Sequence, residues 1–265
     1  MNESSDDAMD SPLASPADGQ RPIPERHPWL TFALPWAVYV LLGSLEPRPP
    51  SAHAASGWLP ISYGYYPVVY TLKIACTLAA ILWVSPGYKR FPFRVTLVAP
   101  LVGLAGIGVW VGLCSLHLES RCSSAACLSW LAELGRRSAY NPFQELAAVP
   151  ACWLWTYVVV RSFGLIVVAA IIEEFFLRGF LMPLCINADW QNVPFGTVSC
   201  GAVLVAVLYG VLTHPAELLA AAAWFALVTW LMTKTKNLWD CVVAHAVTNL
   251  LLGVYVLVTG HWEFL

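Results

Sequence analysis

Long, uninterrupted runs of apolar residues constrain the fold of this chain more than any other feature. The runs lie near residues 29–45, 67–84, 95–118, 146–160, 163–184, 198–212, 218–232 and 238–258. Because about 20 apolar residues in a helix span the hydrocarbon of a bilayer, each run predicts a transmembrane helix. A membrane barrel would need short segments of alternating polarity, which these Leu, Val and Ala runs do not provide. The sequence therefore predicts an all-α, polytopic integral membrane bundle of about eight transmembrane helices.

Composition supports an integral membrane protein and gives no support to nucleic-acid binding. Hydrophobic residues make up 58% of the chain and charged residues 11%, whereas roughly a quarter of an ordinary soluble domain is charged. The net charge of −2 provides no basic face for nucleic acid, so we expect no nucleic-acid partner.

Polarity along the chain also predicts its organisation. Residues 1–28 are acidic and rich in Pro and Ser, without a basic start or a cleavage site, so a disordered tail is expected rather than a signal peptide. Residues 29–265 form a single transmembrane domain with a motif-bearing core at 146–260. Cys122 and Cys127 are candidates for a disulfide if their loop faces an oxidising compartment.

Three ionisable residues interrupt the run 163–184, namely Glu173, Glu174 and Arg178. Each costs about 2.5–3.5 kcal/mol inside a membrane span, so such residues normally face a cavity, pair with one another and serve a function. Glu174 and Arg178, four residues apart, are expected to form an ion pair on one helical face. Glu173 is rotated by about 100° and remains as a free base. A buried ion cluster that only joins helices is the structural alternative.

Further polar residues interrupt later runs. His214 ends the sixth run, and His245 and Asn249 share one helical face of the last run at a spacing of four. With Glu173, they suit the attack of water on an amide carbonyl. Glu173 would take a proton from water, His214 would hold that water or donate to the leaving amine, and the other two would stabilise the oxyanion. The predicted central polar catalytic cavity contains Glu173, His214, His245 and Asn249, supported by Glu174 and Arg178.

Other functions could use the same residues. Zinc is a minority alternative to a cofactor-free site, because Glu173, His214 and His245 could bind it and leave a position for water, although no HExxH motif is present. A non-catalytic membrane scaffold, for example an immunity-type protein, would use them for helix association. A transporter would need a polar path through the bilayer, and the sequence has one polar cluster.

Three segments together resemble the CAAX protease and bacteriocin-processing family. EEFFLR, which begins at Glu173, resembles its EExxxR motif, and HAVTN, from His245 to Asn249, resembles its HxxxN motif. LYGVLTH, which ends at His214, resembles its FxxxH motif, but Gly occupies the Phe position and a Tyr stands one residue earlier. The resemblance implies a metal-independent, glutamate-dependent intramembrane endopeptidase in which the first Glu activates water and the last His and Asn form the oxyanion hole.

The amino-terminal half adds a second resemblance. WLTFALPWAVYVLLGSLEP and YPVVYTLKIACTLAAILWV resemble CAAX prenyl protease-related proteins that occur with exosortase and PEP-CTERM sorting systems. This implies a multi-pass protein of a bacterial inner membrane that acts on a membrane-associated peptide or protein, with an exosortase system as a possible partner.

Overall fold

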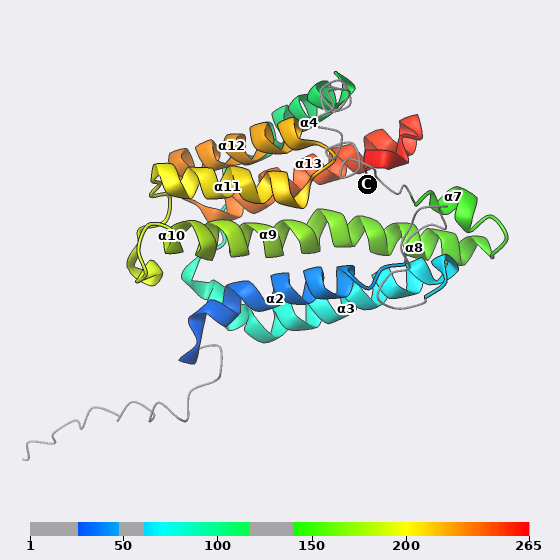
Figure 1. Cartoon of the computed structure of the whole chain (residues 1–265), viewed down its shortest axis with the longest axis horizontal. Helices are drawn as coiled ribbons and strands as arrows, with labels where there is room; N and C mark the ends of the chain where they lie inside the picture. The colour runs from blue at the N-terminus through cyan, green and yellow to red at the C-terminus, as the bar shows by residue number, and fades with distance from the viewer. Residues whose placement is uncertain (1–25, 48–60, 117–139, 265) are drawn as a thin grey trace, which may run out of the picture.

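A computed structural model describes residues 26–47, 61–116 and 140–264, and these ranges are helical without a strand (Figure 1). Most of the predicted tail and both cysteines of the candidate disulfide, Cys122 and Cys127, lie outside the described residues. The helical elements are α2 (Pro28–Gly43), η2 (Tyr63–Tyr65), α3 (Tyr66–Val84), η3 (Ser85–Arg90), α4 (Val98–Ser115), α7 (Pro142–Glu145), α8 (Ala151–Phe163), η5 (Gly164–Ala169), α9 (Ala170–Phe176), η6 (Leu177–Leu181), α10 (Met182–Leu184), η7 (Trp190–Asn192), α11 (Cys200–Thr213), α12 (Leu218–Thr235), α13 (Leu238–Thr259) and η8 (Trp262–Phe264).

The predicted polytopic helical membrane bundle is confirmed. Five helical segments are long and apolar enough to cross a bilayer, and they span Tyr63–Arg90, Val98–Ser115, Ala151–Leu184, Leu218–Thr235 and Leu238–Thr259. Helices α2 and α11 are also apolar but shorter. Both of these short helices border the cavity that contains the candidate site.

The segment from α8 to α10 differs from the sequence prediction. The sequence favoured two spans, divided at Arg161, with one tilted helix over residues 149–169 as the alternative, and Ala151–Leu184 is one continuous helical segment of 34 residues. Arg161 does not break the helix because its side chain is buried and its Nη1 donates a hydrogen bond of 2.8 Å to the hydroxyl of Tyr157, one turn earlier. Within this segment, η5 and η6 are π-helical, a local geometry frequent at functional sites.

Helix α9 lies in the middle of the bundle. Figure 1 shows it between a layer of α2 and α3 and a layer that contains α11, α12 and α13, and α9 contacts both α2 and α13. Side chains of α9 pack against both layers. Phe175 packs in a hydrophobic cluster with Phe32 of α2, whereas Phe176 packs against a cluster that contains Phe225 of α12. The motif-bearing helix is therefore fixed from two sides.

Two glycines of α4 allow close packing against the site-bearing helices. A Cβ atom on Gly103 would lie 2.7 Å from the carbonyl oxygen of Ala244, and one on Gly106 would lie 2.8 Å from Oγ1 of Thr248. Both contacts are with α13. Small residues at such positions let membrane helices approach closely, where packing rather than the hydrophobic effect drives association. Helix α13 is thereby held against α4 over the turns that carry His245.

Candidate active site

The two consecutive glutamates of α9 have different surroundings. Glu174 is fully buried and binds two partners, because Arg178 Nη1 donates to its Oε2 and Nδ1 of His245 lies 3.0 Å from its Oε1. Arg178 also donates through Nη2 to the carbonyl of Phe225 at 3.3 Å. The ion pair expected from the spacing is present, and it also contacts His245, which lies 71 positions later in the sequence.

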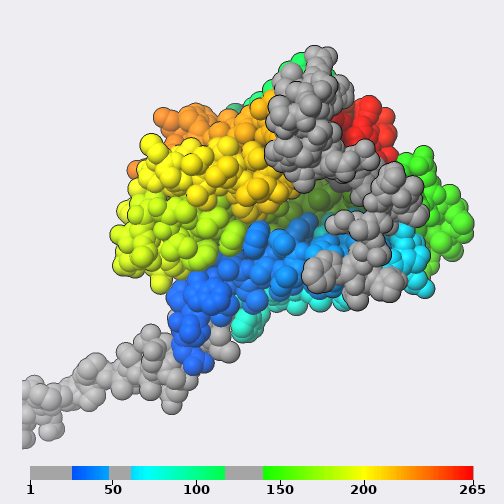
Figure 2. Space-filling model, viewed as in Figure 1, coloured from blue at the N-terminus to red at the C-terminus, as the bar shows by residue number. Residues whose placement is uncertain are grey.

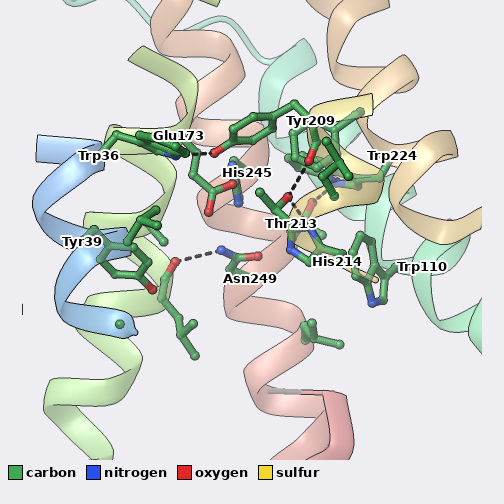
Figure 3. Close-up of a pocket in the computed structure, with 18 of the residues that line it drawn as sticks. Trp36, Tyr39, Trp110, Glu173, Tyr209, Thr213, His214, Trp224, His245 and Asn249 are labelled. Atoms are coloured by element: carbon green, nitrogen blue, oxygen red, sulfur yellow. Dashed lines mark hydrogen bonds between the residues drawn. The ribbon is translucent and has the colours of Figure 1, made fainter. Parts of the chain in front are cut away.

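Glu173 faces a cavity instead. Its Oε2 atom is buried and makes no hydrogen bond within the described part of the chain. Figure 3 shows its side chain pointing toward His245 in the middle of the cavity. The carboxylate is close enough to interact electrostatically with His245, Glu174 and Arg178. Glu173 is thus a half-buried acidic residue that lines the cavity and whose buried Oε2 has no hydrogen-bond partner among the described residues.

The cavity has a volume of about 720 Å³ and is bordered by α2, η5, α11, α12 and α13, together with single residues of α4, α9 and η8. All four predicted catalytic residues, Glu173, His214, His245 and Asn249, are among those that line it. In Figure 2, α9 lies recessed between the atoms of α11 and those of α2. The cavity therefore lies between the two short apolar helices.

His245 and Asn249 reach the cavity from successive turns of α13. Nδ1 of His245 is engaged by Glu174, which leaves Nε2 as the second ring nitrogen. Asn249 donates through Nδ2 to the carbonyl of Leu165 in the π-helical segment η5 at 2.8 Å (Figure 3). This bond fixes the direction of the amide group, and Nδ2 retains a second hydrogen for another acceptor.

His214 is the C-terminal cap residue of α11. Its Nδ1 lies 3.2 Å from the carbonyl oxygen of Gly210 and 2.9 Å from Oγ1 of Thr213, which itself donates to the carbonyl of Tyr209 at 2.9 Å. Since a carbonyl only accepts hydrogen bonds, this geometry assigns the proton of a neutral ring to Nδ1. Nε2 is then an acceptor.

The aromatic support of His214 comes from other helices. Its ring centroid lies 5.2 Å from that of Trp110 on α4 and 6.0 Å from that of Phe225 on α12. A Cβ atom on Gly210 would clash with the Phe225 ring, so this ring fills the space beside the motif position that carries Gly here. The displaced aromatic residue, Tyr209, instead accepts a hydrogen bond of 2.8 Å from Nε1 of Trp36.

Several cavity residues gave no signal in the sequence. Trp36, Tyr39, Trp110, Trp224 and Phe225 form aromatic walls around the polar groups. Each is an apolar or aromatic residue within an apolar run, so only the packing of distant helices identifies it.

A metal centre has less support from the geometry. Among the described residues, no three His, Cys, Asp or Glu side chains converge in a way that could hold a metal ion. Glu173, His214 and His245, the set that zinc would need, therefore line one cavity without forming such a group.

Comparison with known proteins identifies a family for the segment that carries these residues. The family model described as type II CAAX prenyl endopeptidase Rce1-like matches residues 153–251, a range that includes all four predicted catalytic residues. No curated protein and no solved structure matches the chain.

Proposed function

We propose that the chain hydrolyses peptide bonds within the membrane by a glutamate-activated water, and the match of residues 153–251 to the Rce1-like model of type II CAAX prenyl endopeptidases supports this. The observation that carries this proposal is the contrast between the two glutamates. Glu174 is paired with Arg178 and His245, whereas Glu173 lines the shared cavity and its buried Oε2 makes no hydrogen bond among the described residues. A buried acceptor without a partner is costly, which supports a role toward water or substrate.

The contact with Glu174 supports a role for His245 as a donor. An imidazole ring with a hydrogen on both nitrogens donates through Nδ1 to the Glu174 carboxylate and has its second N–H group, at Nε2, for another acceptor. Its Nε2–H group could then donate to an oxyanion, together with the second Nδ2 hydrogen of Asn249. Such preorganised donors typically contribute about 100-fold to 1000-fold in rate each.

The proposed reaction begins with a water molecule between Glu173 and His214. Nε2 of His214 accepts a hydrogen bond from this water, and Glu173 removes a proton as the water oxygen forms a bond to the substrate carbonyl carbon. The negative charge that develops on the carbonyl oxygen is held by His245 and Asn249. As the C–N bond breaks, the amine nitrogen takes the proton from Glu173. The second proton of the water stays on the new carboxyl group and then passes to the amine, so that the products leave as a carboxylate and an ammonium.

The direct test is cleavage of a prenylated peptide that ends in a CAAX sequence by purified protein in detergent. Glu173→Gln should remain folded in a thermal melt and lose about 100-fold to 10,000-fold in rate, the range for a general base. Glu145→Gln, an exposed residue of α7, is the matched control and should cleave like the wild type. Unchanged cleavage by Glu173→Gln would contradict the proposal.

A zinc chelator distinguishes the metal alternative in the same assay. We expect the wild-type rate to be unchanged by the chelator, whereas a loss that added zinc restores would establish zinc catalysis. The CAAX peptide is the substrate that the matched family of type II CAAX prenyl endopeptidases indicates. A bacterial inner-membrane location and an exosortase partner stay predictions from the amino-terminal resemblance.

A further inference from the structure

Arg161 is a buried cation without a carboxylate partner among the described residues. It lies on α8, is 7% exposed, and its Nε atom has no hydrogen-bond acceptor there. The other two buried cations are paired, Lys73 with Glu46 and Arg178 with Glu174. An unpaired charge inside a membrane bundle is expensive and is normally kept for a function.

The groups around Arg161 stabilise a cation without neutralising it. Nη1 donates to the Tyr157 hydroxyl at 2.8 Å, and the guanidinium lies 5.9 Å from the ring centroid of Tyr66. The hydroxyl of Tyr70 donates to the backbone carbonyl of Arg161 at 3.4 Å. These tyrosines hold the side chain in place and leave its positive charge uncompensated.

Arg161 also borders a small cavity that adjoins the candidate active site. This second cavity has a volume of about 30 Å³ and is lined by Arg161, Leu165, Asn249 and residues of α7, α13 and η8, among others. Leu165 and Asn249 also line the large cavity. A space of this size holds on the order of two water molecules, which is comparable to the two oxygens of a carboxylate.

One face of the long helix connects Arg161 to the catalytic glutamate. Arg161, Leu165, Ala169 and Glu173 follow one another at four-residue steps, and the last three line the large cavity. At 1.5 Å per residue, Arg161 lies about 6 Å along the helix from Leu165 and about 18 Å from Glu173. An extended peptide of about two to five residues covers this range.

We propose that Arg161 binds a carboxylate of the substrate, two to five residues from the bond that is cleaved. The proposal rests on the proposed function, because it places the substrate between Glu173 and Arg161. A guanidinium binds a carboxylate through two parallel hydrogen bonds, and burial makes this recognition selective. The carboxylate belongs either to the end of the peptide chain or to an acidic side chain, and both have the same chemistry.

Binding is tested with an N-acetylated apolar tripeptide in three forms, as the free acid, as the C-terminal amide, and as an amide with one Glu. Affinity is measured from the concentration dependence of thermal stabilisation. The wild type should bind the free acid about 10-fold to 100-fold more tightly than the plain amide, as expected for a charged hydrogen-bonded contact. Tight binding of the Glu-containing amide as well would identify an acidic side chain as a second source.

Arg161→Gln should bind all three peptides equally, and Arg161→Lys should retain part of the preference if the glutamine variant does not fold. Arg94→Gln, an exposed residue outside both cavities, is the control and should behave like the wild type. Equal affinity of the wild type for acid and amide, or binding of neither, would overturn the proposal.

Cleavage separates this proposal from the proposed function. With the prenylated CAAX peptide and its C-terminal amide, the wild type should favour the acid through KM, and Arg161→Gln should cleave both at the rate that the wild type shows for the amide. Cleavage of both peptides at one rate by the wild type would retain the peptidase and reject the role of Arg161. Selective binding of the tripeptide acid without cleavage of the CAAX peptide would retain the role of Arg161 and reject the proposed peptidase.

Discussion

Nδ1 of His245 lies 3.0 Å from Oε1 of Glu174, whose other carboxylate oxygen accepts a hydrogen bond from Arg178. The motif-bearing turns of α9 and α13 are therefore joined by a buried three-residue network. The neighbouring Glu173 is outside this network and faces the cavity. We therefore expect the two adjacent glutamates to have separable effects, Glu174 on stability and orientation and Glu173 on the rate of the reaction.

Substitution of the two glutamates by glutamine should separate these effects. Glu174→Gln leaves Arg178 as an uncompensated buried charge, which typically costs about 3–5 kcal/mol, so we expect a clearly lower melting temperature and a lower rate. Glu173→Gln should change the melting temperature little and lose the rate. Thermal melts and CAAX-peptide cleavage measure both quantities. Equal destabilisation by the two substitutions would indicate that Glu173 is also part of the structural cluster.

The contact between Gly210 and Phe225 gives a packing prediction. Because an added Cβ atom would clash with the Phe225 ring, Gly210→Ala should destabilise the protein by about 1–3 kcal/mol and displace the adjacent His214. Phe225→Leu in the same chain should recover part of both stability and activity. Gly108→Ala is the control, because a Cβ atom there meets nothing within 4 Å. If the effects of Gly210→Ala and Phe225→Leu on stability simply add, the contact between these two residues is not the cause of the destabilisation.

The sequence identified the polar residues of the site because ionisable and amide groups are rare and costly in membrane spans. Glu173, His214, His245 and Asn249 lie far apart in sequence and line one cavity. The ion pair of Glu174 and Arg178 followed from helix geometry alone. The catalytic roles of Glu173, His214, His245 and Asn249 stay predictions.

Other features could not be found from residue type or spacing. Arg161 was interpreted as a boundary between spans, since the sequence does not reveal that Tyr157 accepts its hydrogen bond within a continuous helix. The support of His214 by Phe225 depends on the packing of α12 against α11. Asp240, a fully buried carboxylate in α13, has a structural role, because it accepts hydrogen bonds from the backbone N–H and the hydroxyl of Thr96 near the start of α4.

Charge at the ends of the bundle predicts its orientation, which the sequence alone left open. Among the described residues, the six Lys and Arg side chains other than the three buried ones are Arg26, Lys89, Arg90, Arg94, Lys234 and Lys236. Arg90, Arg94 and Lys236 line one pocket at the end where α3 and α12 finish. Four further residues of this kind, Arg48, Arg121, Arg136 and Arg137, lie in the sequence segments that follow α2 and α4, so the six residues are the larger set. Because cytoplasmic loops carry an excess of Lys and Arg, we expect the end with this pocket to face the cytoplasm.

Single cysteines in a variant without native cysteines test this orientation. Lys89→Cys should react with a membrane-impermeant thiol reagent only in inside-out vesicles, and Glu145→Cys, next to the other end of the bundle, only in right-side-out vesicles. Both positions are exposed, so access to the reagent depends on the side of the membrane. The opposite labelling pattern would reverse the orientation.

Asn249 should act on the rate more than on stability. Its Nδ2 donates to the Leu165 carbonyl and keeps one hydrogen for an oxyanion, so Asn249→Ala should lower kcat by about 100-fold to 1000-fold and stability by about 1 kcal/mol. The neighbouring Thr248 provides the contrast, because its hydroxyl joins α13 to α4 by donating to the carbonyl of Gly103, besides that of Ala244 in its own helix. Thr248→Val should therefore lower the melting temperature with a smaller effect on kcat. A loss of stability in Asn249→Ala with a rate within tenfold of the wild type would instead make Asn249 a helix-joining residue, as in the scaffold alternative.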